Sequence, residues 1–168
     1  MLSVQVLSAL LTGIFFRADN SSQTVLPHRL DTTNTSSAVV SSVKQAVSSI
    51  LNVCGFVVSF YVLISIFDTT GLIMKLCTLL SRVTALPIDF SRVLLIGALE
   101  LGSGAAAMQT FTPSPLNLAL AAAMLGWGGL SVHFQTLAVL SESNIKGTLH
   151  TAGRLISAIL AFILMYLI

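Results

Sequence analysis

The chain has 168 residues, of which 55% are apolar and only 8% are charged, and its mean hydropathy is +0.94. Soluble domains carry about 25% charged residues, so this composition excludes an ordinary soluble fold and predicts an integral membrane protein. Eight basic and six acidic residues give a formal charge of +2, and the basic residues are scattered, which excludes a nucleic-acid-binding surface.

The N-terminal part divides into two stretches of opposite composition. Residues 1–17 are apolar up to Arg17, lack the basic start and small-residue cleavage site of a secretory signal, and are short for a membrane span. We interpret them as a partial hydrophobic segment, the tail of a span from a larger ancestral protein. Residues 18–42 are rich in Ser, Thr, Asn and Asp, which predicts a polar flexible loop. Residues 43–168 are predicted to form one transmembrane domain.

The first predicted span covers residues 43–67. Residues 68–92 differ, because apolar residues recur at helical spacing and Lys75 and Arg82 lie seven positions apart on one face. This pattern predicts an amphipathic helix in the membrane interface, or one arm of a shallow hairpin, and Pro87 is predicted to end it.

An ionisable residue interrupts the next apolar stretch, residues 93–110. Glu100 lies at membrane depth if this stretch enters the bilayer, and burying a carboxylate there costs at least a few kcal/mol, which favours a functional role. The alternative is a structural role, in which Glu100 makes a hydrogen bond or an ion pair with Arg92, Arg154 or His133.

Two glycines follow this carboxylate directly. Gly102 and Gly104 allow the backbone to turn, and a helix that restarts at Ser103 would present its first amides to an anionic or hydrogen-bond-accepting group.

The longest interrupted segment covers residues 115–140. Gly126, Gly128 and Gly129 each weaken a helix by about 1 kcal/mol relative to alanine. An opened helix at membrane depth must face protein or a wet cavity, as in the solute sites of transporters. The alternative is that the glycines allow a neighbouring helix to approach closely.

Polar side chains follow these glycines at once, and this favours a site. Ser131, His133 and Gln135 lie within five positions of one another. Because histidine titrates near neutral pH, a pair formed by His133 and Glu100 would also be able to carry a proton.

We therefore predict an all-α fold, a multipass transmembrane helical bundle with two interrupted or re-entrant helices. Paired interruptions point to a binding site for a small polar solute near the midplane of the bilayer. The predicted binding residues are Glu100, Gly102, Ser103, Gly104, Gly128, Gly129, Ser131, His133 and Gln135.

The distribution of basic residues gives a predicted orientation. If 93–112 and 116–140 make a return trip across the membrane, residues 68–92 and 141–154 share a side. That side has five basic residues against three on the other, which favours it as cytoplasmic. The final apolar stretch is long enough to span if its helix begins near Thr148.

No enzyme motif is present. The chain lacks HExxH, GxSxG, a P-loop and any cysteine–histidine spacing typical of metal sites. Cys54 and Cys77 lie in apolar surroundings and are interpreted as small core residues. We predict no catalytic activity, no metal and no cofactor.

Four stretches carry a resemblance to a known family. GALELGSG (97–104) and GWGGLSVHFQTLAVL (126–140) resemble the sporulation integral membrane proteins of endospore-forming bacteria, the YlbJ type. NVCGFVVSFYVLISI (52–66) and GRLISAILAFILMYL (153–167) lie in the matching order around them. Such proteins are similar, more distantly, to the Gate or nucleoside-recognition membrane domain shared with nucleoside and ferrous-iron transporters.

This resemblance implies a multipass protein of the mother-cell or forespore membrane, needed for endospore formation and building of the spore cortex. The resemblance implies that the family's acidic and glycine-containing motif falls on Glu100, Gly102 and Gly104. Its motif of glycine, serine, histidine and glutamine falls on Gly128, Gly129, Ser131, His133 and Gln135. Family members have another membrane half upstream, so the implied partners are the lipid bilayer and either a second copy or a separately encoded N-terminal membrane half.

Two functions stay open at this point. One is a transporter-like module that binds or moves a small polar solute. The other is a structural or assembly membrane protein of the sporulating cell with no transport activity, in which small residues form helix contacts and polar residues join helices.

Overall fold

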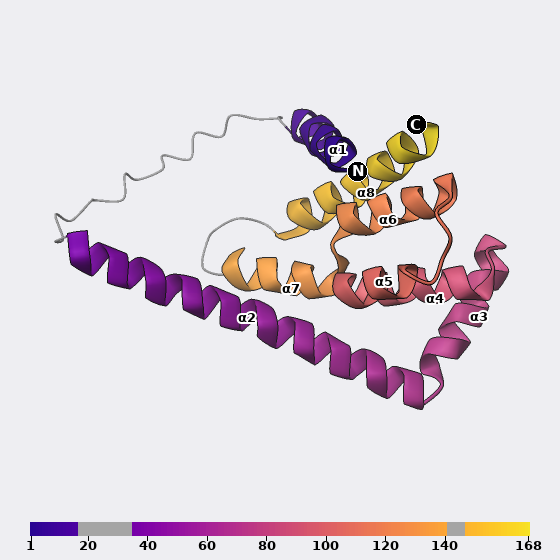
Figure 1. The fold of residues 1–168 in the computed structure, drawn as a ribbon, viewed down its shortest axis with the longest axis horizontal. Helices are drawn as coiled ribbons and strands as arrows, with labels where there is room; N and C mark the ends of the chain where they lie inside the picture. Colours follow the sequence, from indigo (N-terminus) through magenta and orange to yellow (C-terminus); the bar gives the residue numbers. More distant parts are fainter. Residues whose placement is uncertain (17–34, 141–146) are drawn as a thin grey trace.

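The computed structural model describes residues 1–16, 35–140 and 147–168 (Figure 1). Every regular element in these ranges is a helix, so the all-α prediction is confirmed. The helices are α1 (Leu2–Phe15), α2 (Thr35–Thr69), α3 (Leu72–Thr84), α4 (Ile88–Leu99), α5 (Leu101–Met108), α6 (Pro115–Trp127), α7 (Gly129–Leu140) and α8 (Gly147–Leu167).

Three segments of the described chain are long and apolar enough to cross a membrane. They are Ser36–Thr69, Pro115–Leu140 and Gly147–Leu167. The last of these has 21 residues, which at 1.5 Å per residue gives about 32 Å, enough for a hydrocarbon core about 30 Å thick. The chain is therefore a membrane protein by the length and composition of its helices.

Helix α2 begins earlier than the sequence predicted. The predicted loop extended through residue 42, but residues 35–42 are helical, and residues 18–34 of that loop lie outside the described residues. The stretch contains neither proline nor glycine, and its hydroxyls bond within the helix, since Ser42 Oγ donates to the Ala38 carbonyl at 2.9 Å. Serine at such positions is compatible with a helix, because this bond pairs its hydroxyl without opening the backbone.

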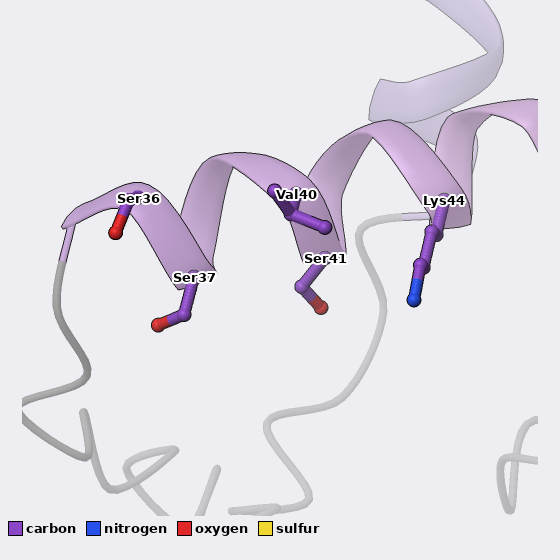
Figure 2. Close-up of a pocket in the computed structure, with 5 residues that line it drawn as sticks. All are labelled: Ser36, Ser37, Val40, Ser41 and Lys44. Carbon is purple, nitrogen blue, oxygen red and sulfur yellow. The ribbon is translucent and has the colours of Figure 1, made fainter.

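Figure 2 shows the first turns of α2, where hydroxyl groups and one ammonium group lie beside a hollow of about 430 Å³. Ser37, Ser41 and Lys44 follow one another at helical spacing and point to the same side. The described residues that line this hollow all belong to α2: Ser36, Ser37, Val40, Ser41 and Lys44. A hollow walled by a single helix is a polar surface, so it is a weaker site candidate than the helix breaks.

Helix α3 is the amphipathic helix that the sequence predicted. It buries Ile73 and Cys77, one turn apart, and exposes Lys75 and Arg82. The helix ends at Thr84, before Pro87, because Ala85 adopts a left-handed conformation. Pro87 instead precedes the first residue of α4, a position where its missing amide costs nothing.

Helices α4 and α5 form a hairpin that turns at Glu100. The rings of Phe90, near the start of α4, and Phe111, after the end of α5, lie 4.6 Å apart. Between these ends, Gly97 and Gly104 bring the two backbones into contact, and a Cβ on Gly104 would lie 2.7 Å from the Gly97 nitrogen. The chain thus returns to the end of the bundle from which α4 started (Figure 1).

The second break, between α6 and α7, does not reverse the chain. Gly128 has φ +83° and Gly129 has φ +77°, conformations that residues with a Cβ rarely adopt. Helix α7 continues away from α6 in the same general direction, displaced sideways (Figure 1). Both predicted interruptions are therefore present, one as a hairpin and one as an offset.

The hairpin changes the predicted orientation. Figure 1 places the start of α2, the end of α7 and the start of α8 at one end of the bundle, and the end of α2 with α3 and the start of α4 at the other. Residues 68–92 and the described part of the second range, 147–154, thus lie at opposite ends of the bundle, because the chain turns back at Glu100. The predicted shared side assumed a return trip by 93–112 and 116–140, and the side of the membrane that each end faces stays a prediction.

The closest helix packing joins α6, α8 and α1. A Cβ on Gly126 would lie 2.7 Å from the Ala158 Cα, so only glycine allows α6 and α8 to approach this closely. Ala122 and Ala161 are fully buried beside Val4 of α1. Small residues at such contacts are typical of membrane helices, so the alternative interpretation of the glycines is correct for Gly126.

Candidate functional site

The two helix breaks meet. A Cβ on Gly129 would lie 3.0 Å from the Leu101 nitrogen and 3.3 Å from the Gly97 oxygen, so the start of α7 lies against the tip of the α4–α5 hairpin. Trp127 Nε1 donates to the Ala98 carbonyl at 3.1 Å and joins the end of α6 to the end of α4. The C-terminal ends of α4 and α6 and the N-terminal ends of α5 and α7 therefore converge.

Glu100 caps the helix that follows it. Its side chain is 5% exposed and accepts hydrogen bonds from the backbone amides of Gly102, at 2.9 Å, and Ser103, at 2.5 Å. The prediction that the helix restarts at Ser103 is wrong, because Leu101 is already helical and Glu100 is the N-cap. A carboxylate suits this position, since it pairs with free amides and faces the positive end of the helix dipole.

The glycines around Glu100 have separate roles. A Cβ on Gly102 would lie 3.3 Å from both carboxylate oxygens, so glycine leaves room for the cap. Gly104 packs against Gly97, as described above, and holds the hairpin closed. Neither glycine lies in an open cavity of its own.

Arg154 of α8 caps the other break. Its Nε donates to the Trp127 carbonyl at 3.2 Å and its Nη2 to the Leu125 carbonyl at 3.3 Å. These carbonyls belong to the last turn of α6, where a cation faces the negative end of the helix dipole. A Cβ on Gly128 would overlap the guanidinium, so glycine is required there for space as well as for its positive φ.

The predicted partners of Glu100 bind elsewhere. Arg92 forms an ion pair with Asp68 at 2.9 Å that joins the end of α2 to α4, and the hydrogen bond that Arg92 donates to the Asp68 carboxylate raises the pKa of Arg92. Arg154 bonds to α6, and no hydrogen bond joins Glu100 to His133 among the described residues. The structural alternative for Glu100 is thus correct in kind, but its partners are backbone amides of its own helix.

The predicted polar cluster on α7 divides between two faces. Gln135 Nε2 donates to Ser131 Oγ at 3.2 Å, one turn apart on the same face. His133 lies two positions from each of these residues, on the other side of the helix. There the centroid of its ring lies 4.2 Å from that of the Trp127 ring and 5.5 Å from that of the His150 ring. The period of 3.6 residues explains this division, and the sequence already contained it.

His133 has the largest unmet hydrogen-bonding capacity near the breaks. It is 4% exposed, and neither of its ring nitrogens makes a hydrogen bond within the described part of the chain. The nearby Trp127 carbonyl already accepts a hydrogen bond from Arg154. A buried polar group without a partner costs about 1–3 kcal/mol, so His133 is the side chain here best able to gain from a bound molecule.

The sequence did not identify every residue of the site. Trp127 and the capping role of Arg154 were missed, although an arginine inside an apolar span is itself a signal. Across the described ranges, no group of three or more His, Cys, Asp or Glu side chains lies close enough to hold a metal ion.

No protein-family model, no curated protein and no solved structure matches this chain. The resemblance to sporulation membrane proteins stays a prediction from the four stretches quoted above.

Proposed function

We propose that the protein is a solute-binding module of a multipass membrane protein of endospore formation. In this proposal α4–α5 is a re-entrant hairpin, α6–α7 is a broken span, and a small polar solute binds where their breaks meet. The observation that carries the proposal is the contact of Gly129 with the hairpin tip, 3.0 Å from a Gly129 Cβ position to the Leu101 nitrogen. The assignment to endospore formation is supported by the resemblance of residues 43–168.

Helix lengths support a break at membrane depth. With 12 and 8 residues, α4 and α5 are about 18 Å and 12 Å long, and neither can cross a core about 30 Å thick. The 26 residues of Pro115–Leu140 give about 39 Å, enough to cross despite the offset. Irregular backbone at that depth is tolerated where protein or a cavity faces it.

The charges at the breaks favour a neutral solute. Glu100 and Arg154 each already bond to backbone groups of a helix end, and their formal charges are opposite, so together they give the breaks no net charge to attract an ion. The first amides of α7 have no partner within α7, and His133 offers one donor and one acceptor. A neutral molecule with several donors and acceptors, such as a nucleoside, has the matching chemistry.

The exposed apolar surface of α2 indicates which molecules contact this protein in the membrane. Only 6% of its most apolar 18-residue stretch is buried within the chain, and side chains such as Val57, Val58 and Tyr61 are exposed. Lipid covers this surface in our proposal, together with a second copy or a separately encoded N-terminal membrane half that completes the solute site.

The second candidate function is an assembly protein without transport activity. It is favoured by the same capping bonds, because breaks that are fully paired internally need no ligand. In that case the close packing of Gly126 on Ala158 and the hydrogen bond of Gln135 to Ser131 serve only to hold helices together.

Uptake by reconstituted liposomes separates the two functions. We expect the protein, with its partner half if one co-purifies, to accumulate labelled uridine, and His133→Ala to abolish accumulation while membrane abundance stays at the wild-type level. Lys44→Gln, on the exposed start of α2, is the matched control and retains uptake.

Two results would contradict the solute site. One is reduced abundance of His133→Ala with unchanged uptake per molecule. The other is a stable co-purifying partner with no uptake of any neutral polar solute and normal sporulation of a Glu100→Gln strain, which supports the assembly function.

A further inference from the structure

A second cavity lies away from the tip of the hairpin, between α1, α7 and α8, and has a volume of about 640 Å³. It contains no residue of α4 or α5 and shares only Arg154 with the breaks described above. Ligand pockets for single small molecules have volumes of about 300–1,000 Å³, so this one has the size of a binding site.

The polar groups of the cavity are hydroxyls, an imidazole and a guanidinium. They belong to Thr12, Thr136, Ser157, His150 and Arg154, and no acidic side chain is among the described residues that line the cavity. Arg154 uses two of its N–H groups on the carbonyls of α6, and a guanidinium has five, so it retains donors for a further acceptor. His150 Nδ1 is buried and makes no hydrogen bond within the described residues.

Apolar side chains form the remaining wall. Phe15 and Phe16 come from the end of α1, Leu140 from the end of α7 and Leu149 from the start of α8. These helix ends lie at the same end of the bundle (Figure 1), while Arg154 and Ser157 lie one to three turns further inside. The cavity thus has an apolar outer part and a cationic inner part.

We propose that this cavity binds a single-chain acidic amphiphile of the fatty-acid class, with its carboxylate on Arg154 and His150 and its chain against the phenylalanines. The charge complementarity is one-sided, because Arg154 is the one charged side chain among the described residues that line the cavity. Carboxylates bind arginine through short, charge-assisted hydrogen bonds, and the donors left on Arg154 are suited to one. One chain fits a volume of about 640 Å³, whereas a two-chain phospholipid would leave its second chain outside.

Binding is measured with cis-parinaric acid, a fluorescent fatty acid, on the full-length protein in phosphatidylcholine nanodiscs. We expect saturable binding above that of empty nanodiscs, displaced by oleate and not by oleyl alcohol, which has the same chain length without the charge. His150→Gln and Arg154→Gln each weaken binding by about tenfold through loss of a charge-assisted or hydrogen-bonding contact.

A cavity-filling variant keeps the test independent of Arg154, which also caps α6. Gly13 lines the cavity, and a Cβ placed there meets nothing within 4 Å, so Gly13→Leu fills it without a clash. Gly55→Leu on α2 is the matched control, since its Cβ also meets nothing within 4 Å and it lies outside the cavity. We expect Gly13→Leu to abolish binding and Gly55→Leu to leave it unchanged.

Three results would overturn the proposal. They are the absence of saturable binding, equal displacement by oleyl alcohol and oleate, and binding that persists in Gly13→Leu. Displacement by phosphatidylglycerol but not by oleate would also overturn it, in favour of a two-chain lipid. Uridine uptake is measured on the same Gly13→Leu protein and is expected to be normal, so failure here and failure of the solute site are distinguishable.

Discussion

The two helix breaks are paired by different means. At the break between α4 and α5, the charged group that caps the start of α5 is Glu100, which lies at the break and accepts hydrogen bonds from the amides two and three positions later. At the second, the charge comes from another helix, since Arg154 bonds to carbonyls of α6 at a separation of 27 residues or more. The first cap is therefore local, whereas the second cap exists only when α6 and α8 are packed together.

The two breaks also differ in the direction that the chain takes after each of them. At the local break the chain reverses, and Gly97 and Gly104 let the backbones of α4 and α5 come into contact beside Met124 of α6. The remote break allows only an offset, because α6 is held by α8 and by α1 over much of its length. Local capping thus accompanies a reversal of the chain, and remote capping accompanies a span that continues past its break.

The largest expected effect concerns the side of the membrane on which the α4–α5 hairpin ends. We expect Thr112→Cys and Lys75→Cys to react with an impermeant maleimide from one side of the membrane and Lys44→Cys from the other. The background is Cys54→Ala; Cys77 is retained, because it is 1% exposed and burial raises the pKa of its thiol, which slows its reaction. Labelling of Thr112→Cys from the Lys44 side would show that α4–α5 crosses.

The next effect tests closure of the hairpin. A Leu side chain at Gly104 overlaps the Gly97 backbone, so Gly104→Leu is expected to destabilise the protein by about 3 kcal/mol or more. Thermal unfolding followed by size-exclusion chromatography in detergent measures it. Gly55→Leu, where a Cβ meets nothing within 4 Å, is the control, and an equal loss in both variants would refute a specific contact.

The third effect compares the two caps directly. We expect Glu100→Ala and Arg154→Gln each to cost about 1–2 kcal/mol, because each leaves backbone groups of a helix end without a partner. Hydrogen exchange distinguishes them: Glu100→Ala increases exchange at Gly102 and Ser103 alone, whereas Arg154→Gln increases it in both α6 and α8, the two helices that Arg154 joins. Exchange confined to one helix in both variants would remove the contrast between a local and a remote cap.

The smallest expected effect concerns the link between the breaks. Trp127→Phe retains the ring beside His133 and removes the hydrogen bond to the Ala98 carbonyl, which is expected to cost about 1 kcal/mol. Equilibrium unfolding in urea and mixed micelles measures this difference. An unchanged midpoint would mean that the two breaks touch without stabilising each other.

Several features of the fold could be read from the sequence. The apolar stretches, the amphipathic α3 and the two interruptions follow from composition, helical spacing and glycine content, which act over a few residues. The division of Ser131 and Gln135 from His133 also follows from the helical period alone. The start of α2 at Thr35 was missed, because serine-rich helix turns and serine-rich loops have the same composition.

The sequence by itself determined where helices span and where they break, because hydrophobicity and the conformational freedom of glycine are properties of single residues and short stretches. Only the tertiary structure decided that one break reverses the chain and the other does not, and that Arg154 caps α6 instead of pairing with Glu100. The reason is that both outcomes depend on contacts between helices far apart in the chain, such as Gly126 on Ala158, and no local pattern specifies which helices meet.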